Sequence, residues 1–169
     1  PGGEKTAERM GYEDMVLDWF PDGSKVLFRS RRETISSWLG KLYGIPVEGG
    51  LAEPLPVPEG GLTSFSPDGK KIAYCRTFRD FRTWKRYKGG MAQEIWIYDL
   101  NTYEIERVTD YEGVDHFPMW YKERIYFVSD RTGTSNIYCY DLKTRQPRQI
   151  TTYTDYDVKW PSLGPDAIV

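Results

Sequence analysis

Residues 62–75, LTSFSPDGKKIAYC, together with residues 94–100, EIWIYDL, and 105–109, IERVT, form the stretch around which the chain is organised. Each run is short, rich in β-branched and aromatic residues, and alternates with a period of two, as β-strands do. Pro67 presets φ at the first turn, and Gly69 supplies a positive φ there. The stretch therefore predicts a four-stranded antiparallel meander over residues 62–109.

The same four-strand unit recurs along the chain. The predicted strands of the first copy are 14–20, 24–30, 41–47 and 52–57, and those of the third copy are 114–120, 124–129, 135–142 and 147–151. A fourth copy begins with 157–160 and continues at 167–169. Because proline cannot donate to a strand ladder, Pro54 and Pro56 predict that the 52–57 strand is outermost in its sheet.

Four-stranded repeats of roughly 40 to 50 residues are typical of β-propeller blades. A large aromatic residue ends the first strand of each copy and fixes the register: Trp19, Phe65, Trp120 and Trp160. We therefore predict an all-β fold, a β-propeller with about three blades and the start of a fourth. An ordinary sandwich of irregular hairpins is the alternative.

The whole chain, 1–169, is predicted to be one partial propeller. Residues 1–13 form an N-terminal loop, the blades span 14–60, 61–110 and 111–152, and 153–169 start the next blade. A propeller closes with about four to eight blades, so we expect either a longer native protein or residues that are part of a larger propeller. An open end would leave apolar blade faces in need of a partner.

The composition suits a globular β protein, because 39% of the residues are hydrophobic and 15% are aromatic. A net charge of -2 gives no electrostatic reason to expect nucleic acid or anionic lipid as a partner. No apolar run is long enough to cross a bilayer, and the first residues lack a signal-peptide pattern. We expect no membrane segment and no cofactor.

The two cysteines, Cys75 and Cys139, each lie inside a predicted strand. They lack the CxxC spacing of a zinc site or redox pair, so no metal is expected. Buried free thiols are the favoured interpretation. A disulfide would require their Cα atoms to lie within about 7 Å of each other.

A family resemblance is carried by a succession of segments. The Ser66-Pro67-Asp68-Gly69-Lys70 turn and its later Tyr98-Asp99-Leu100 strand resemble TolB-like repeats. The longer succession is similar to the six-bladed N-terminal propeller of the tricorn protease family over nearly the whole chain; its segments are Arg76-Thr77-Phe78, Trp84-Lys85-Arg86-Tyr87-Lys88-Gly89-Gly90, Glu94-Ile95-Trp96-Ile97, Arg124-Ile125-Tyr126-Phe127 and Thr152-Tyr153-Thr154-Asp155-Tyr156.

This resemblance implies a non-catalytic propeller part of a large oligomeric serine peptidase that trims peptides. Its partners would be peptides and the remaining domains or subunits, with a homo-oligomer in the full-length protein. The implied location is cytoplasmic, or periplasmic if a signal peptide precedes the segment. The alternative function is a TolB-like propeller scaffold for protein–protein interaction with no protease attached.

No catalytic residues are expected in this chain. It contains one histidine, His116, in the connection before a predicted strand, and it has no G-x-S-x-G elbow, no HExxH motif and no Walker loop. The family's catalytic serine and histidine belong to later domains. A structural or solvent-facing role is therefore expected for His116.

The resemblance also suggests where a substrate end could bind. In the family, an Arg-Arg pair before a Met, upstream of a Pro-Asp-Gly turn, is held to bind the carboxylate end of peptides. Arg9 matches this motif, and Glu8 occupies the other arginine's position. Arg31 and Arg32 form another adjacent pair, but in a loop outside the motif position. All three arginines are candidate substrate-binding residues, with an exposed loop as the alternative for the pair.

The insertion at 76–90 is strongly cationic and unusually aromatic. One acid, Asp80, accompanies six basic residues, Arg76, Arg79, Arg82, Lys85, Arg86 and Lys88, and four aromatic residues, Phe78, Phe81, Trp84 and Tyr87, are interleaved with them. A solvated loop would have little use for four aromatics. We predict a docking loop for a neighbouring domain or subunit, in which Arg82, Trp84, Lys85 and Tyr87 make the contacts; peptide contact and plain solvent exposure are the alternatives.

Overall fold

The computed structural model describes residues 13–34, 39–80 and 85–169, and every regular element in these ranges is a β-strand. The strands group into three sheets of four. The first contains β1 (Met15–Trp19), β2 (Lys25–Ser30), β3 (Lys41–Pro46) and β4 (Glu53–Pro54). The second contains β5 (Thr63–Phe65), β6 (Lys71–Tyr74), β7 (Trp96–Asp99) and β8 (Ile105–Arg107). The third contains β9 (Asp115–Tyr121), β10 (Arg124–Ser129), β11 (Asn136–Asp141) and β12 (Gln146–Gln149).

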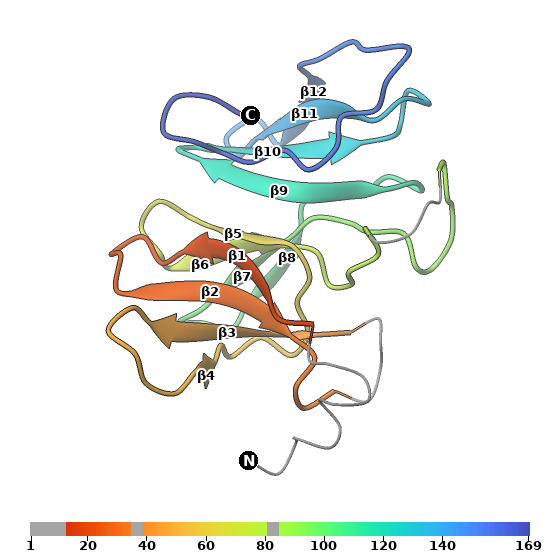
Figure 1. Cartoon of the computed structure of the whole chain (residues 1–169). Coiled ribbons are helices and arrows are strands. Elements are labelled where there is room, and N and C mark those ends of the chain that lie inside the picture. The colour runs from red at the N-terminus through yellow and green to blue at the C-terminus, as the bar shows by residue number, and fades with distance from the viewer. Residues whose placement is uncertain (1–12, 35–38, 81–84) are drawn as a thin grey trace.

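Each sheet is a meander in which strands adjacent in sequence pair antiparallel. The sheets contact one another chiefly through their first strands, because β1 packs near β5 and β5 packs near β9 (Figure 1). Successive sheets of this kind, with the first strand of each sheet innermost, are the blades of a β-propeller. The predicted all-β propeller fold is confirmed.

The Pro-Asp-Gly turns owe their shape to side-chain hydrogen bonds as well as to glycine. Asp68 accepts hydrogen bonds from the Ser66 hydroxyl at 2.7 Å and from the Lys70 amide at 3.1 Å. These donors hold the pKa of the Asp68 carboxyl below its usual value. Gly69 has φ of 69°, a left-handed conformation that costs glycine little. The sequence motif therefore fixes the link between β5 and β6.

The core consists of two clusters, each between neighbouring sheets. Period-two alternation in β7 places Ile97 in the cluster shared with the third sheet and Tyr98 in the cluster shared with the first. The first cluster also contains Trp120 and Phe127, and the second contains Leu27 and Phe65. Strands β6 and β7 of the middle sheet are therefore largely buried between its neighbours, whereas β8 is exposed.

The outermost strand of the first sheet lies where the prolines predicted it. It is shorter than the predicted 52–57, because only Glu53 and Pro54 pair with β3. Both residues are exposed. Since proline lacks an amide hydrogen, the prolines limit the ladder on this side.

The aromatic residues that end the inner strands have the same register but different surroundings. Trp19 lies opposite Val26, and Phe65 lies opposite Ile72. Phe65 is buried, whereas 58% of Trp19 is exposed. A register shift interrupts β1 before Trp19, and the next residue, Phe20, packs its ring 4.6 Å from Phe65. Phe20 therefore packs between the first two sheets, and Trp19 does not.

Two local expectations near the end of the chain are also corrected. No strand forms at 157–160; the Val158 amide donates instead to the Ser135 carbonyl of the third blade at 2.8 Å. Downstream, Leu163 and Ile168 form an isolated antiparallel bridge. His116 lies within β9, inside the predicted 114–120 strand and not in the connection before it, and it pairs in register with Val128.

Candidate functional site

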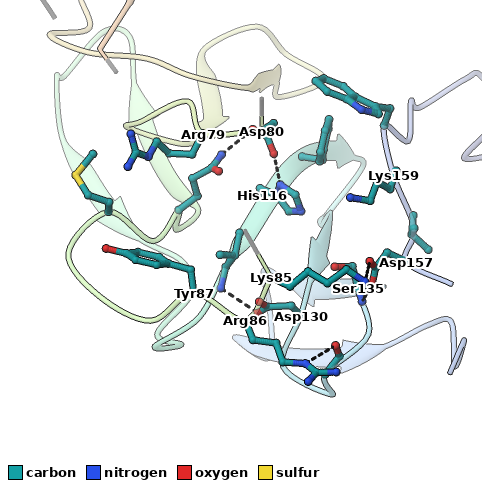
Figure 2. A pocket seen from close by; sticks show the side chains of 17 residues that line it. Arg79, Asp80, Lys85, Arg86, Tyr87, His116, Asp130, Ser135, Asp157 and Lys159 are labelled. Carbon is teal, nitrogen blue, oxygen red and sulfur yellow. Dashed lines mark hydrogen bonds and ion pairs between the residues drawn. The ribbon is translucent and has the colours of Figure 1, made fainter. Parts of the chain in front are cut away.

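A cavity of about 100 Å³ lies between the insertion of the second blade and the loops of the third blade (Figure 2). Arg79, Asp80 and residues 85–87 line it from the insertion. His116 lines it from β9, and residues 157–160 close the far side. The cavity is therefore assembled from three segments that are distant in sequence.

Two hydrogen-bonded contacts hold the insertion against the third blade. The Lys85 amino group lies 2.6 Å from Asp157, whose other oxygen accepts the Ser135 amide at 3.0 Å. The Arg86 guanidinium donates to the Gly133 carbonyl at 3.1 Å. The bond from Lys85 and the Ser135 amide hold the pKa of the Asp157 carboxyl below its usual value. Asp157 therefore remains anionic and links the insertion to the blade.

Two basic residues of the insertion pair with acidic residues of neighbouring turns. Besides Lys85 with Asp157, Lys88 lies 2.9 Å from Glu112. Both Lys88 and Glu112 are largely exposed, so their pair contributes little. The Asp157 side chain is only 10% exposed, which makes the pair from Lys85 the stronger link.

Asp80 and His116 form the most buried polar contact of the cavity. The Asp80 side chain is 2% exposed, and its Oδ1 contacts His116 Nδ1. Its Oδ2 accepts a hydrogen bond from Gln93 at 2.9 Å. Asp80 therefore fixes the imidazole through one nitrogen and leaves Nε2 for the cavity. The sequence carried a signal for this contact, since Asp80 is the one acid of a basic insertion, but the partner could not be predicted.

Arg31 and Arg32 are engaged within the first blade. The Arg31 guanidinium lies 2.5 Å from Glu13, and Arg32 lies 3.0 Å from Asp14. Arg32 also donates to the Ser30 hydroxyl at 3.0 Å. The pair is thus bound to acids of its own chain. The other arginine proposed for substrate binding, at position 9, lies outside the described residues, and substrate binding by all three stays a prediction.

The Arg32 arrangement recurs in the third blade with deeper burial. Arg131 donates to the Ser129 hydroxyl at 2.8 Å and to both oxygens of Asp115, at 3.0 and 2.8 Å. The Asp115 side chain is 2% exposed. Burial raises the pKa of the Asp115 carboxyl, and Arg131 opposes that shift. This repeated Ser-x-Arg contact fixes the loop after the second strand in the first and third blades.

The predicted docking loop is described only in part. Lys85 and Tyr87 line the cavity, whereas Arg82 and Trp84 lie outside the described residues. Phe78 is buried in the core, 4.9 Å below the Arg29 guanidinium. Phe78 thus packs within the chain. Docking of the loop on another domain or subunit stays a prediction.

A second, larger cavity follows the inner strands on the propeller axis. It has a volume of about 950 Å³ and is bordered by β1, β5, β9 and residues 160–165. Val16 and Trp19 expose 71% and 58% of their surface and line it. The inner strands thus present apolar side chains to an open space.

Both cysteines are free and buried. Burial raises the pKa of the Cys75 thiol well above its ordinary value, and burial also raises that of Cys139. Within residues 13–34, 39–80 and 85–169, no three His, Cys, Asp or Glu side chains gather as metal ligands. No helix suited to spanning a bilayer occurs in these ranges either.

Three four-stranded meanders that contact one another through their first strands define a β-propeller module. Among solved structures, it is similar to the tricorn protease, with a TM-score of 0.72 and 28% identity over 88% of this chain and 14% of that chain. It is also similar to TolB from Acinetobacter baumannii, with a TM-score of 0.64 and 27% identity over 85% of this chain and 34% of that chain.

Residues 2–169 match the family described as the tricorn protease N-terminal beta propeller domain, and the chain belongs to that family. It is 31% identical over 141 residues to a tricorn protease homolog of Saccharolobus solfataricus. It is 30% identical over 154 residues to the tricorn protease of Thermoplasma acidophilum. These matches cover 83% and 91% of this chain, but the chain spans only 13% and 14% of the two relatives.

Proposed function

We propose that this chain is a non-catalytic β-propeller part of a tricorn-like serine peptidase, contributing to peptide passage, substrate-end binding and assembly during peptide degradation. Family membership over residues 2–169 is the observation that carries the proposal. The relatives that share this propeller are named proteases and are several times longer than the chain. The propeller would thus serve chemistry performed elsewhere in the protein.

Peptide passage would use the axial cavity. The inner strands border this cavity and expose Val16 and Trp19, which can make apolar contacts with an extended peptide. These contacts do not form a deep pocket that would trap the peptide. Weak, repeated contacts suit a passage, because a peptide must leave as readily as it enters. The cavity is wide enough in volume, at about 950 Å³, for several residues of a peptide.

The test places a bulky group in this passage. In the full-length protein, Val16→Cys would be labelled with a polymer-bearing maleimide, and hydrolysis of long and short peptides would be compared. The native Cys75 and Cys139 are buried and should not react. Labelling should slow long peptides several-fold more than short ones. Labelled Leu51→Cys is the control, since Leu51 is 89% exposed and does not border the axial cavity; equal effects at both positions would contradict passage.

Assembly would use the insertion. In the full-length protein, Trp84→Ala with Tyr87→Ala should weaken the oligomer or its activity without unfolding the blade, since neither residue lies in a strand predicted from the sequence. Aromatic side chains that find a partner surface contribute about 1.5 to 3 kcal/mol each. Light scattering after size exclusion, with a peptidase assay, measures both effects. Unchanged mass and turnover would leave the loop as a solvated insertion.

Substrate-end binding is proposed for Arg9, Arg31 and Arg32. Arg31 and Arg32 already pair with Glu13 and Asp14, so a peptide carboxylate would have to compete with these acids. Arg9→Ala should therefore raise KM for peptides with a free C-terminus more than Arg32→Ala does. A larger effect from Arg32→Ala would reverse this assignment.

A TolB-like binding scaffold without a protease is the second candidate function. The similarity to TolB, at a TM-score of 0.64, favours it. The native gene product beyond residue 169 distinguishes the two, because a serine peptidase core would follow only in the first. The peptidase proposal includes a cytoplasmic location, with the periplasm as the alternative if a signal peptide precedes this segment. Cell fractionation of the native protein tests the location.

A further inference from the structure

His116 and Lys159 face one another across the cavity between the insertion and the third blade (Figure 2). Within the described ranges, the Lys159 amino group makes no ion pair and acts on Asp157 only at longer range, and His116 contacts only Asp80 among acids. Two nitrogen groups that can both be cationic thus point into one small space. An arrangement of this kind is favourable when an anion lies between them.

The imidazole is held for such a role by groups behind it. Asp80 Oδ1 contacts His116 Nδ1, and Asp80 Oδ2 accepts a hydrogen bond from the Gln93 amide group. Asp80 is nearly inaccessible to solvent, so it cannot turn away to another partner. A protonated His116 therefore keeps one N–H on Asp80 and directs its Nε2–H into the cavity.

The acids that line the cavity are already engaged. Asp157 accepts from Lys85 and from the Ser135 amide, and Asp130 accepts from the Val114 amide at 3.0 Å. The charged groups around His116 are Arg79, Asp80, Lys85, Arg86, Asp130, Asp157 and Lys159. Four of these are cations and three are anions, so the lining carries an excess of positive charge, and a protonated His116 increases it.

We propose that this cavity binds a carboxylate group between His116 Nε2 and the Lys159 amino group. Two donors on opposite sides match the two oxygens of a carboxylate. Phe117 and Trp160 line the same space and can take the attached carbon atoms. A volume of about 100 Å³ admits a carboxylate with a few carbons and not a whole peptide. The carboxylate would therefore come from a chain terminus or from an acidic side chain.

His116 itself reports on this binding, because it is the one histidine of the sequence. In proton NMR of the 169-residue chain, its Cε1 proton should shift saturably on addition of acetate. Lys159→Gln should weaken acetate binding at least about tenfold, the effect expected for losing a charge-assisted hydrogen bond.

Lys143→Gln is the matched control. Lys143 is also exposed, but it pairs with Glu123 beside the β11–β12 turn and does not line the cavity. It should leave the acetate affinity unchanged. N-acetylglycine and N-acetylaspartate amide, compared at equal concentration, distinguish a terminal carboxylate from an acidic side chain, and binding of either supports the proposal.

Three results would overturn the proposal. The His116 signal could fail to shift with any carboxylate, Lys159→Gln could bind acetate as well as the unchanged chain does, or inorganic phosphate could bind while both carboxylates do not. The proposal does not depend on the peptidase function, because the readout is binding to this chain alone. A failure here would leave the axial-passage experiment unaffected.

Discussion

The ion pair between Arg131 and Asp115 should contribute much more to stability than its counterpart in the first blade, Arg32 with Asp14. Each arginine also donates to a serine two residues earlier and lies over aromatic rings. The two pairs differ in exposure. The side chains of Arg131 and Asp115 are 21% and 2% exposed, whereas those of Arg32 and Asp14 are 32% and 47% exposed.

The perturbation is arginine to methionine at each site, which keeps an apolar stem against the rings. Arg131→Met leaves the Asp115 carboxylate buried without its cation, and breaking a buried pair in this way costs about 3 to 5 kcal/mol. Arg32→Met breaks an exposed pair, for which about 0 to 1 kcal/mol is expected. The matched variants should therefore differ by at least about 2 kcal/mol in the free energy of unfolding.

The loss of stability caused by Arg131→Met should also depend on pH. Burial raises the pKa of Asp115 in the folded chain, and removing Arg131 takes away an opposing influence. A carboxyl whose pKa is raised by folding favours the folded state below its unfolded pKa and loses that advantage as pH rises through the folded pKa. The variant should thus be less destabilised near pH 4.5 than at pH 7.5.

Urea unfolding followed by circular dichroism measures these differences at both pH values. The slope of the transition should stay the same in both variants, so that the midpoint reports stability alone. Equal destabilisation by Arg131→Met and Arg32→Met would refute the argument that burial sets the value of this repeated contact. A larger loss for Arg131→Met at pH 4.5 than at pH 7.5 would refute the assignment of the effect to the Asp115 carboxylate.

Two further predictions concern the insertion and the thiols. Lys85→Ala should release the insertion from Asp157 and speed tryptic cleavage after Arg86 several-fold, as mass spectrometry of timed digests would show; an unchanged cleavage rate would mean that other contacts hold the loop. Cys75 and Cys139 should react slowly with a thiol reagent in the folded chain and both should react in urea, because burial hides them and raises the pKa of each thiol. Rapid native reaction of either cysteine would contradict its burial.

The sequence by itself determined the blades. Strand position and turn position depend on neighbours in sequence: alternation decides which residues of a run can face a core, and Pro67 with Gly69 decides where β5 turns into β6. The prolines at 54 and 56 correctly marked an outer strand for the same reason. Local chemistry of this kind does not require knowledge of what lies across the sheet.

Only the tertiary structure decided where partners lie across blades. Trp19 has the predicted register but is exposed, because the register shift in β1 gives its place to Phe20. Residues 157–160 have a strand-like pattern, yet a strand needs a paired neighbour, and the Val158 amide bonds to Ser135 instead. The cavity between the insertion and the third blade also depends on contacts across blades. Asp80 and His116 are 36 positions apart in the sequence. Their spacing does not show that the insertion of one blade contacts the inner strand of the next.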